Sequence, residues 1–200
     1  MGEQARRTTP KGTEARARVI TEATRIFARD GYRSGSLSAI ATAAGLTQQG
    51  LLHYFPNKAA LLLAVVTERD SRTAAFLAEH TTSESALDTF VDGVRHNMGE
   101  PHLVELMTVL SAESTSPDHP THTWFVERYE ELVARLAAGV VVEQEAGRWA
   151  SSVEPITDAR MLIGLADGLR LQRLLGHPDL DHARLLEQMI NWLRSGVIEA

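Results

Sequence analysis

Apolar residues recur along this chain at the spacing of an α-helix, three or four residues apart, from Thr13 almost to the last residue. The two-residue alternation typical of half-buried strands is nearly absent. Breaks that contain Gly or Pro divide the pattern, for example at residues 99–101, 116–120 and 176–178. The spacing therefore predicts an all-α fold, with long helices over roughly residues 13–30, 58–78, 85–98, 102–114, 121–146, 156–175 and 181–198.

Two short helices are predicted between the first two long ones. Ser36 is suited to cap the first, which ends at Gly45, and Thr47 is suited to cap the second. The second ends before Pro56, because proline disfavours helical geometry in the residue before it. Two short helices joined at a glycine define a helix-turn-helix, whose second helix enters the major groove of DNA. Residues 13–57 are therefore predicted to form a three-helix DNA-binding domain, and residues 58–200 a larger helical domain.

The distribution of charge agrees with this division. Residues 1–58 contain nine Lys or Arg and four Asp or Glu, a net charge of +5. Residues 59–200 contain eleven and twenty-two, a net charge of −11. A basic module on an acidic body indicates that a polyanion binds at one end while the body repels it. Double-stranded DNA is therefore the expected partner of the N-terminal module.

The segment Ile40-Ala41-Thr42-Ala43-Ala44-Gly45-Leu46-Thr47, with the later segment His53-Tyr54-Phe55-Pro56-Asn57-Lys58, closely resembles the TetR family of transcriptional regulators. The order of a long first helix, the helix-turn-helix and an acidic helical body also resembles that family. The resemblance implies a ligand-responsive, sequence-specific regulator, without enzymatic activity or cofactor. It also implies a homodimeric repressor that a small apolar molecule releases from operator DNA.

The resemblance assigns DNA contacts to eight residues. Gln48, Gln49 and Gly50 lie where the family touches bases, and a Gln amide can pair with adenine. The positions that usually hold phosphates are Ser36, Thr47, His53, Tyr54 and Lys58. The alternative interpretation is that the first two only cap helices, Tyr54 only packs in the core and Lys58 is only a solvated charge.

Two residues of the second short helix need separate comment. Gly50 is unfavourable inside a helix by about 1 kcal/mol relative to Ala. Either the helix backbone approaches the groove closely there, or the glycine is merely tolerated. Leu52 departs from the tyrosine that the family commonly has at this position to hold a phosphate. Leu52 is therefore left out of the phosphate set and is expected either to contact a thymine methyl group or to pack within the module.

Residues 1–12 precede the first predicted helix and carry Arg6, Arg7 and Lys11 in a segment rich in Thr, Pro and Gly. This basic arm is expected to be disordered without DNA. It either reaches the minor groove or the DNA backbone, or is a solvated tail.

The last two predicted helices carry more apolar residues than one packing partner covers. In the family, this pair forms a four-helix bundle with its counterpart in the other subunit. The resemblance therefore assigns the following residues to a dimer interface: Leu162, Leu165, Leu169, Leu186, Met189, Ile190 and Leu193. The alternative is one thick core within a single chain.

Large aromatic and sulfur-containing side chains gather in the middle helices, where the family places its ligand cavity. The candidates are Phe90, Met98, Met107, Trp124, Phe125 and Tyr129. Any of them can instead be ordinary core. Together they form a set of candidates from which the ligand contacts are expected to come.

Other functional classes have little support. The chain has no cysteine and none of the common hydrolase, metalloprotease or phosphate-loop motifs, which argues against the alternative of a helical enzyme or lipid carrier. His102, His119 and His122 are interpreted as surface histidines, so no metal site is predicted. No apolar stretch is long enough to span a membrane and the N-terminus does not resemble a secretory signal, so a cytoplasmic location is expected.

Overall fold

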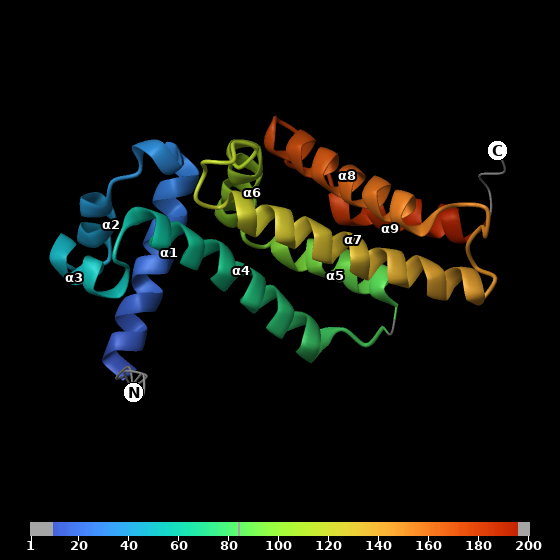
Figure 1. Cartoon of the computed structure of the whole chain (residues 1–200), viewed down its shortest axis with the longest axis horizontal. Helices are drawn as coiled ribbons and strands as arrows, with labels where there is room; N and C mark the ends of the chain where they lie inside the picture. The colour runs from blue at the N-terminus through green and yellow to red at the C-terminus, as the bar shows by residue number, and fades with distance from the viewer. Residues whose placement is uncertain (1–9, 84, 196–200) are drawn as a thin grey trace. The chain divides into compact units, whose positions relative to one another are not determined.

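A computed structural model of the chain describes residues 10–83 and 85–195. In this part of the chain it contains nine helices and no strand, which confirms the predicted all-α fold (Figure 1). The helices are α1 Pro10–Ser34, α2 Leu37–Ala43, α3 Gln48–Tyr54, α4 Lys58–His80, α5 Ala86–Asn97, α6 Pro101–Glu113, α7 His122–Glu145, α8 Pro155–Leu174 and α9 His182–Arg194. Residues 1–9 of the predicted arm, with Arg6 and Arg7, and residues 196–198 of the predicted last helix lie outside the described residues.

The chain divides into two compact units, Met1–Glu68 and Arg69–Ala200. The boundary falls inside α4, eleven residues after the expected one, because the first three turns of α4 belong to the first unit. Leu61, Leu62, Val65 and Val66 are buried there. Helix α4 starts at a cap in which Asn57 Oδ1 accepts from the N–H of Ala60 at 2.8 Å. The helix is thus shared between the two units.

Helix α1 supplies the core of the first unit. Val19, Ala23 and Phe27 have no exposed surface and lie on one stripe of the helix. The helix starts at Pro10 rather than Thr13, so residues 10–12 of the predicted arm are helical. Proline is favourable in the first turn because its missing N–H has no partner to lose there. At the other end Gly31 interrupts the helix with a φ of 75°, a conformation that favours glycine.

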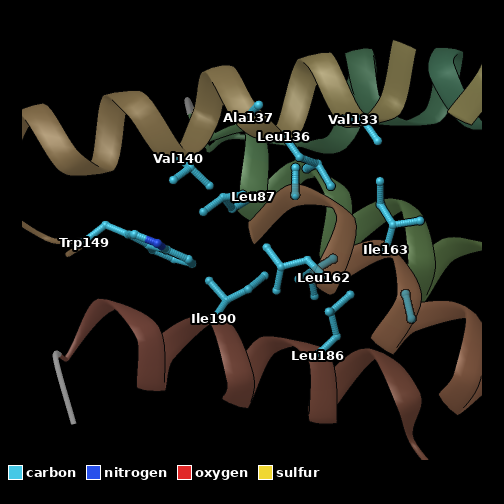
Figure 2. Close-up of a cluster of buried hydrophobic side chains, with 13 residues drawn as sticks. Leu87, Val133, Leu136, Ala137, Val140, Trp149, Leu162, Ile163, Leu186 and Ile190 are labelled. Carbon is cyan, nitrogen blue, oxygen red and sulfur yellow. The ribbon is translucent and has the colours of Figure 1, made fainter. Parts of the chain in front are cut away.

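The core of the second unit lies among α5, α7, α8 and α9 (Figure 1). Figure 2 shows Leu136 and Val140 of α7, Leu162 of α8 and Ile190 of α9 converging on one apolar centre. Trp149, in the loop after α7, enters the same centre. Its indole Nε1 donates to Asp158 Oδ2 at 2.6 Å, which satisfies the buried N–H.

The apolar residues of α8 and α9 do not all lie where the dimer assignment placed them. Leu162, Leu169, Leu186 and Ile190 are buried within the chain's own core. Their assignment to a dimer interface is therefore corrected, because a side chain already covered by its own chain cannot offer surface to a second copy. Leu165, Met189 and Leu193 are partly buried against the same core and keep some exposed surface.

A cluster of charges joins the ends of three helices in the second unit. Glu143, at the end of α7, accepts from Arg194 Nη2 at 2.8 Å and from Arg148 Nε at 2.7 Å. Arg194, the last residue of α9, also donates to Asp88 and to Ser85 at the start of α5. The Glu143 side chain is 3% exposed, so its charge depends on these partners.

Candidate nucleic-acid interface and ligand cavity

Helices α2 and α3 form a helix-turn-helix whose geometry is determined by local capping. The Oγ of Ser36 accepts from the N–H of Ala39 at 3.4 Å, and the Oγ1 of Thr47 accepts from the N–H of Gly50 at 3.0 Å. Gly45 turns the chain between the helices with a φ of 71°, in the left-handed region. Each of these features uses residues within a few positions of one another, which explains why the sequence pattern indicated them.

Helix α3 presents its N-terminal end to solvent. Leu51 is its buried residue, and it anchors the helix to the rest of the unit. Gln48, Gln49 and His53 are exposed, while Tyr54 is half-buried with its ring in edge contact with that of His53. Two adjacent amides at the exposed start of a short helix can reach base edges in a major groove.

Gly50 has a structural reason that neither sequence interpretation contained. A Cβ at this position would lie 3.3 Å from Thr47 Oγ1, closer than ordinary van der Waals contact. A larger residue would therefore press on the hydroxyl that caps α3. Contact of Gly50 with DNA bases stays a prediction.

Lys58 has a partner within the chain that the sequence did not indicate. Its Nζ donates to the carbonyl oxygen of Arg33 at 2.9 Å and lies 4.9 Å from the ring centroid of Tyr32. Burial lowers the pKa of the Lys58 ammonium below its ordinary value. Lys58 thus joins the start of α4 to the end of α1, and its contact with a DNA phosphate stays a prediction.

Two arginines of α1 also serve the helix-turn-helix and were absent from the predicted site. Arg18 Nε lies 3.4 Å from the carbonyl oxygen of Ala44, at the end of α2. The guanidinium of Arg16 lies over the ring of Phe55 at 5.3 Å from its centroid and 3.8 Å from Glu68. Sequence spacing cannot indicate such contacts, because the partners are more than 20 residues apart.

The second unit contains a cavity of about 410 Å³, within the range of small-molecule sites. It is lined by residues of α4, α5, α6, α7 and α8, together with His182 of α9. Phe90, Met107 and Tyr129 of the sequence-based set line it. Met98, Trp124 and Phe125 do not; Phe125 is buried elsewhere, and Trp124 stacks under the guanidinium of Arg128.

Charged side chains that the sequence analysis missed form part of the cavity wall. Asp70 bridges two arginines, with Arg69 Nη1 at 2.6 Å and Arg128 Nε at 2.8 Å. Asp167 accepts from the Tyr129 hydroxyl and forms an ion pair with Arg170, whose Nη1 lies 3.1 Å from Asp167 Oδ1. In the sequence, these charged residues have the same spacing as those of a solvent-exposed helix face. Only the tertiary structure shows that they line a cavity.

Burial changes the acid–base properties of this wall. Burial and the hydrogen bond to Asp167 raise the pKa of Tyr129 to about 12, so the phenol stays a hydrogen-bond donor near neutral pH. Burial, with repulsion by Arg173 and Arg170, lowers the pKa of His182. His182 is therefore expected to be neutral at pH 7.

Of the three histidines predicted to lie on the surface, His102 is exposed, whereas His119 and His122 are partly buried. The His119 side chain is 9% exposed, with Nδ1 at 3.0 Å from Thr121 Oγ1, so the prediction of a surface position is wrong for this residue. His122 Nδ1 lies 2.8 Å from the carbonyl oxygen of Ser114. Within residues 10–83 and 85–195, no group of three His, Asp or Glu side chains could hold a metal ion.

Comparison with known proteins agrees with this arrangement. The family model described as "Bacterial regulatory proteins, tetR family" matches residues 19–65, which contain α2 and α3. A curated relative, the uncharacterized HTH-type transcriptional regulator YdgC of Bacillus subtilis (strain 168), is 26% identical over 193 residues, or 94% of this chain and 95% of YdgC. None of the helices in the described ranges is long and apolar enough to cross a membrane.

Solved structures share the fold. A transcriptional regulator from Saccharomonospora viridis in complex with choline has a TM-score of 0.74 and 23% identity, covering 90% of this chain and 94% of that one. The regulator FadR from Bacillus subtilis in complex with stearoyl-CoA also has a TM-score of 0.74, at 16% identity, covering 90% and 98%. This chain thus combines the DNA-binding helix-turn-helix of the TetR family of transcriptional regulators with the larger helical domain of the fold that these solved regulators share.

Proposed function

We propose that this protein is a homodimeric repressor that leaves its operator when a small molecule binds in the cavity of the second unit. The observation that carries the proposal is the position of the cavity along α4. Residues Arg69 to Leu77 of α4 contribute to the cavity wall, and residues 58–68 of the same helix belong to the DNA-binding unit. One continuous helix thus links the two sites, so a ligand that displaces α4 can act on both.

The DNA-binding part of the proposal assigns base contacts to Gln48, Gln49 and Gly50. Phosphate contacts are assigned to Ser36, Thr47, His53, Tyr54 and Lys58. The support is the exposure of the polar residues at the start of α3 and the free hydrogen-bonding capacity of a capping hydroxyl, which can face a phosphate while it caps.

Replacing Gln48 by Ala is expected to relax base preference by about 1–3 kcal/mol at one position of each half-site, because a Gln amide pairs with adenine through two hydrogen bonds. The measurement is fluorescence anisotropy on a panel of base-substituted duplexes, derived from DNA that the wild-type protein selects. Thr21→Ala is the control, since the exposed Thr21 hydroxyl bonds to the carbonyl of Ala17 in its own helix. An equal loss on every duplex would show that Gln48 does not read bases.

The homodimer is proposed from one face of α8 and α9. Met161 and Leu171 of α8, Leu175 just after its end, and Leu185 and Trp192 of α9 are exposed. Met161 is 57% exposed and Trp192 58%, which is unusual for such large apolar side chains. A second copy of the same face is self-complementary and would cover both stripes.

The small-molecule part of the proposal rests on the cavity and on the fold. Two regulators of this fold are described as complexes, one with choline and one with stearoyl-CoA. The cavity here has a large apolar contribution from Phe90, Met107 and Ile163. These apolar side chains support an effector with a large apolar surface.

A cavity-blocking substitution tests the effector site. Ala74 lines the cavity, and Ala78, one turn further along α4, is exposed and does not. Ala74→Trp is expected to keep operator binding but to resist release by any metabolite that dissociates the wild-type protein, while Ala78→Trp behaves as wild type. A ligand that lowers operator affinity 100-fold requires a coupling free energy of about 2.7 kcal/mol between the two sites. Operator DNA must then lower ligand affinity by the same factor.

The readout is operator anisotropy during titration with fractionated cell extract, followed by ligand titration with and without operator. Equal release of Ala74→Trp and wild type would place the effector elsewhere. A fall in transcription from the operator after deletion of the gene would identify an activator instead of a repressor.

A further inference from the structure

We propose that the effector is an anionic amphiphile, with one carboxylate or similar anion held by Arg69, Arg128 and Arg170 and an apolar remainder in the rest of the cavity. The inference rests on the proposed function in one respect, that the cavity is the effector site. It departs from the wholly apolar effector that the aromatic residues predict.

The first argument is the balance of charge at one end of the cavity. Arg69, Arg128 and Arg170 share two carboxylates, Asp70 and Asp167. Every oxygen of the two carboxylates already has a partner: those of Asp70 accept from Arg69 and Arg128, and those of Asp167 accept from the Tyr129 hydroxyl and pair with Arg170. The lining also contains Arg135 and Glu131, whose charges cancel, so the arginines of the cavity exceed its carboxylates by one positive charge, which a single bound anion would neutralise.

The second argument is burial. The Arg69 side chain is 10% exposed, and its Nε has no hydrogen-bond partner among the described residues. The Nε of Arg170 is also buried without a partner there. Arginine is rarely buried with N–H groups unpaired, because each such group loses its hydration without replacement. Two in one cavity wall indicate that the site is completed by a ligand.

The mutual influence of the arginines supports this geometry. Burial, followed by repulsion from Arg128, lowers the pKa of Arg69, and Arg170 contributes to the same effect. Arg128 and Arg170 therefore lie close enough to Arg69 to destabilise its charge. An anion among them would relieve that repulsion, which is a source of ligand affinity that a neutral or cationic molecule lacks.

The remaining wall indicates the rest of the ligand. Phe90, Met107, Leu132, Leu136 and Ile163 contribute apolar surface to the same cavity. A molecule that buries a hydrocarbon or aromatic body against these residues gains hydrophobic free energy, and its anionic end can reach the arginines. A simple inorganic anion would leave this surface uncovered, so the ligand is amphiphilic.

Two fluorescent probes with the same ring system test the proposal directly. 8-Anilinonaphthalene-1-sulfonate is an anion, and N-phenyl-1-naphthylamine is the same molecule without the sulfonate. Wild-type protein is expected to bind the sulfonate at least about ten-fold more tightly, as expected for one charge-assisted hydrogen-bonding site. Both titrations are made on the full chain without DNA.

Two variants assign the preference to the cavity. Arg69→Met and Arg170→Met are each expected to weaken sulfonate binding about ten-fold and to change binding of the neutral probe by less than about two-fold. Each variant leaves one donor for the partner carboxylate, Arg128 for Asp70 and Tyr129 for Asp167. Arg160→Met removes the same charge from the exposed surface of α8 and is expected to change neither titration.

Circular dichroism melts accompany each variant, and Arg170→Met keeps the test intact if Arg69→Met does not fold. The proposal is overturned by equal binding of both probes, by binding of neither, or by arginine variants that weaken both alike. These titrations contain no operator, so they test the anion site independently of the proposed effector function of the cavity. Sulfonate binding that depends on the arginines but leaves operator affinity unchanged would support the anion site and contradict the effector function.

Discussion

Gly168→Glu is expected to convert the protein from dimer to monomer and to lower operator affinity at least about 100-fold, without loss of monomer stability. Gly164, which is exposed, and Gly168, which is half-buried, lie one turn apart on α8 between the exposed residues Met161 and Leu171. Apart from its chain neighbours and the backbone of α8 itself, a Cβ added at either glycine would meet no described atom within 4 Å. The chain's own packing therefore gives no reason for two glycines in the middle of a helix.

A partner helix supplies that reason. Each glycine destabilises the interior of a helix by about 1 kcal/mol relative to Ala, whereas small residues allow two backbones to approach closely. Glutamate is a better helix former than glycine, so the monomer should become slightly more stable. In a dimer the same side chain would place a charge between two apolar faces, where its desolvation is costly. The monomer then reads a single half-site, which provides little specificity or affinity.

Sedimentation velocity at micromolar concentration measures the association, and anisotropy measures operator binding. Ala134→Glu, which adds the same charge to an exposed position of α7, is the control. Leu186→Glu is unsuitable, because Leu186 has no exposed surface and the charge would unfold the monomer. A dimeric Gly168→Glu protein, or a monomeric wild-type protein, would contradict the proposed interface.

Glu143→Gln is expected to lower the free energy of unfolding by about 2–3 kcal/mol at pH 7, because it leaves Arg194 and Arg148 without their shared counterion. Chemical denaturation followed by circular dichroism measures the change. Glu145→Gln, two residues along the same helix and exposed, is the control, and its effect should stay below about 0.5 kcal/mol.

The ion pairs of Glu143 also predict that the stability of the protein depends on pH. Burial alone would raise the pKa of Glu143, but hydrogen bonds from Arg148 and Arg194 outweigh it and hold the pKa below its ordinary value. The unfolded chain therefore takes up this proton at a higher pH than the folded chain. The resulting stability is fully present above the unfolded pKa of about 4.3 and is lost as pH falls through the folded pKa. A difference between wild type and Glu143→Gln that stays constant from pH 7 to pH 3 would contradict this assignment.

The residues of the helix-turn-helix illustrate what local sequence can predict. Ser36, Gly45, Thr47 and Asn57 act on neighbours within about one helical turn, so their types and spacing were enough to indicate two capped helices, the turn between them and the start of α4. The exposed amides of Gln48 and Gln49 follow from the same local geometry. Lys58 is different, because its partner Arg33 is 25 residues away and no periodic pattern connects them.

The sequence by itself determined the all-α fold, the order of the helices and the position of α3, because all three depend on periodicity and short-range capping. Only the tertiary structure decided which apolar residues of α8 and α9 face the chain's own core. Leu162 and Met161 are adjacent and equally apolar, yet one is buried and the other exposed. The tertiary structure likewise decided that Arg69 and Arg170 line a cavity and do not lie on a solvent-exposed surface. The environment of a side chain depends on helices far away in the sequence, and the residue's own type and spacing do not record which helices these are.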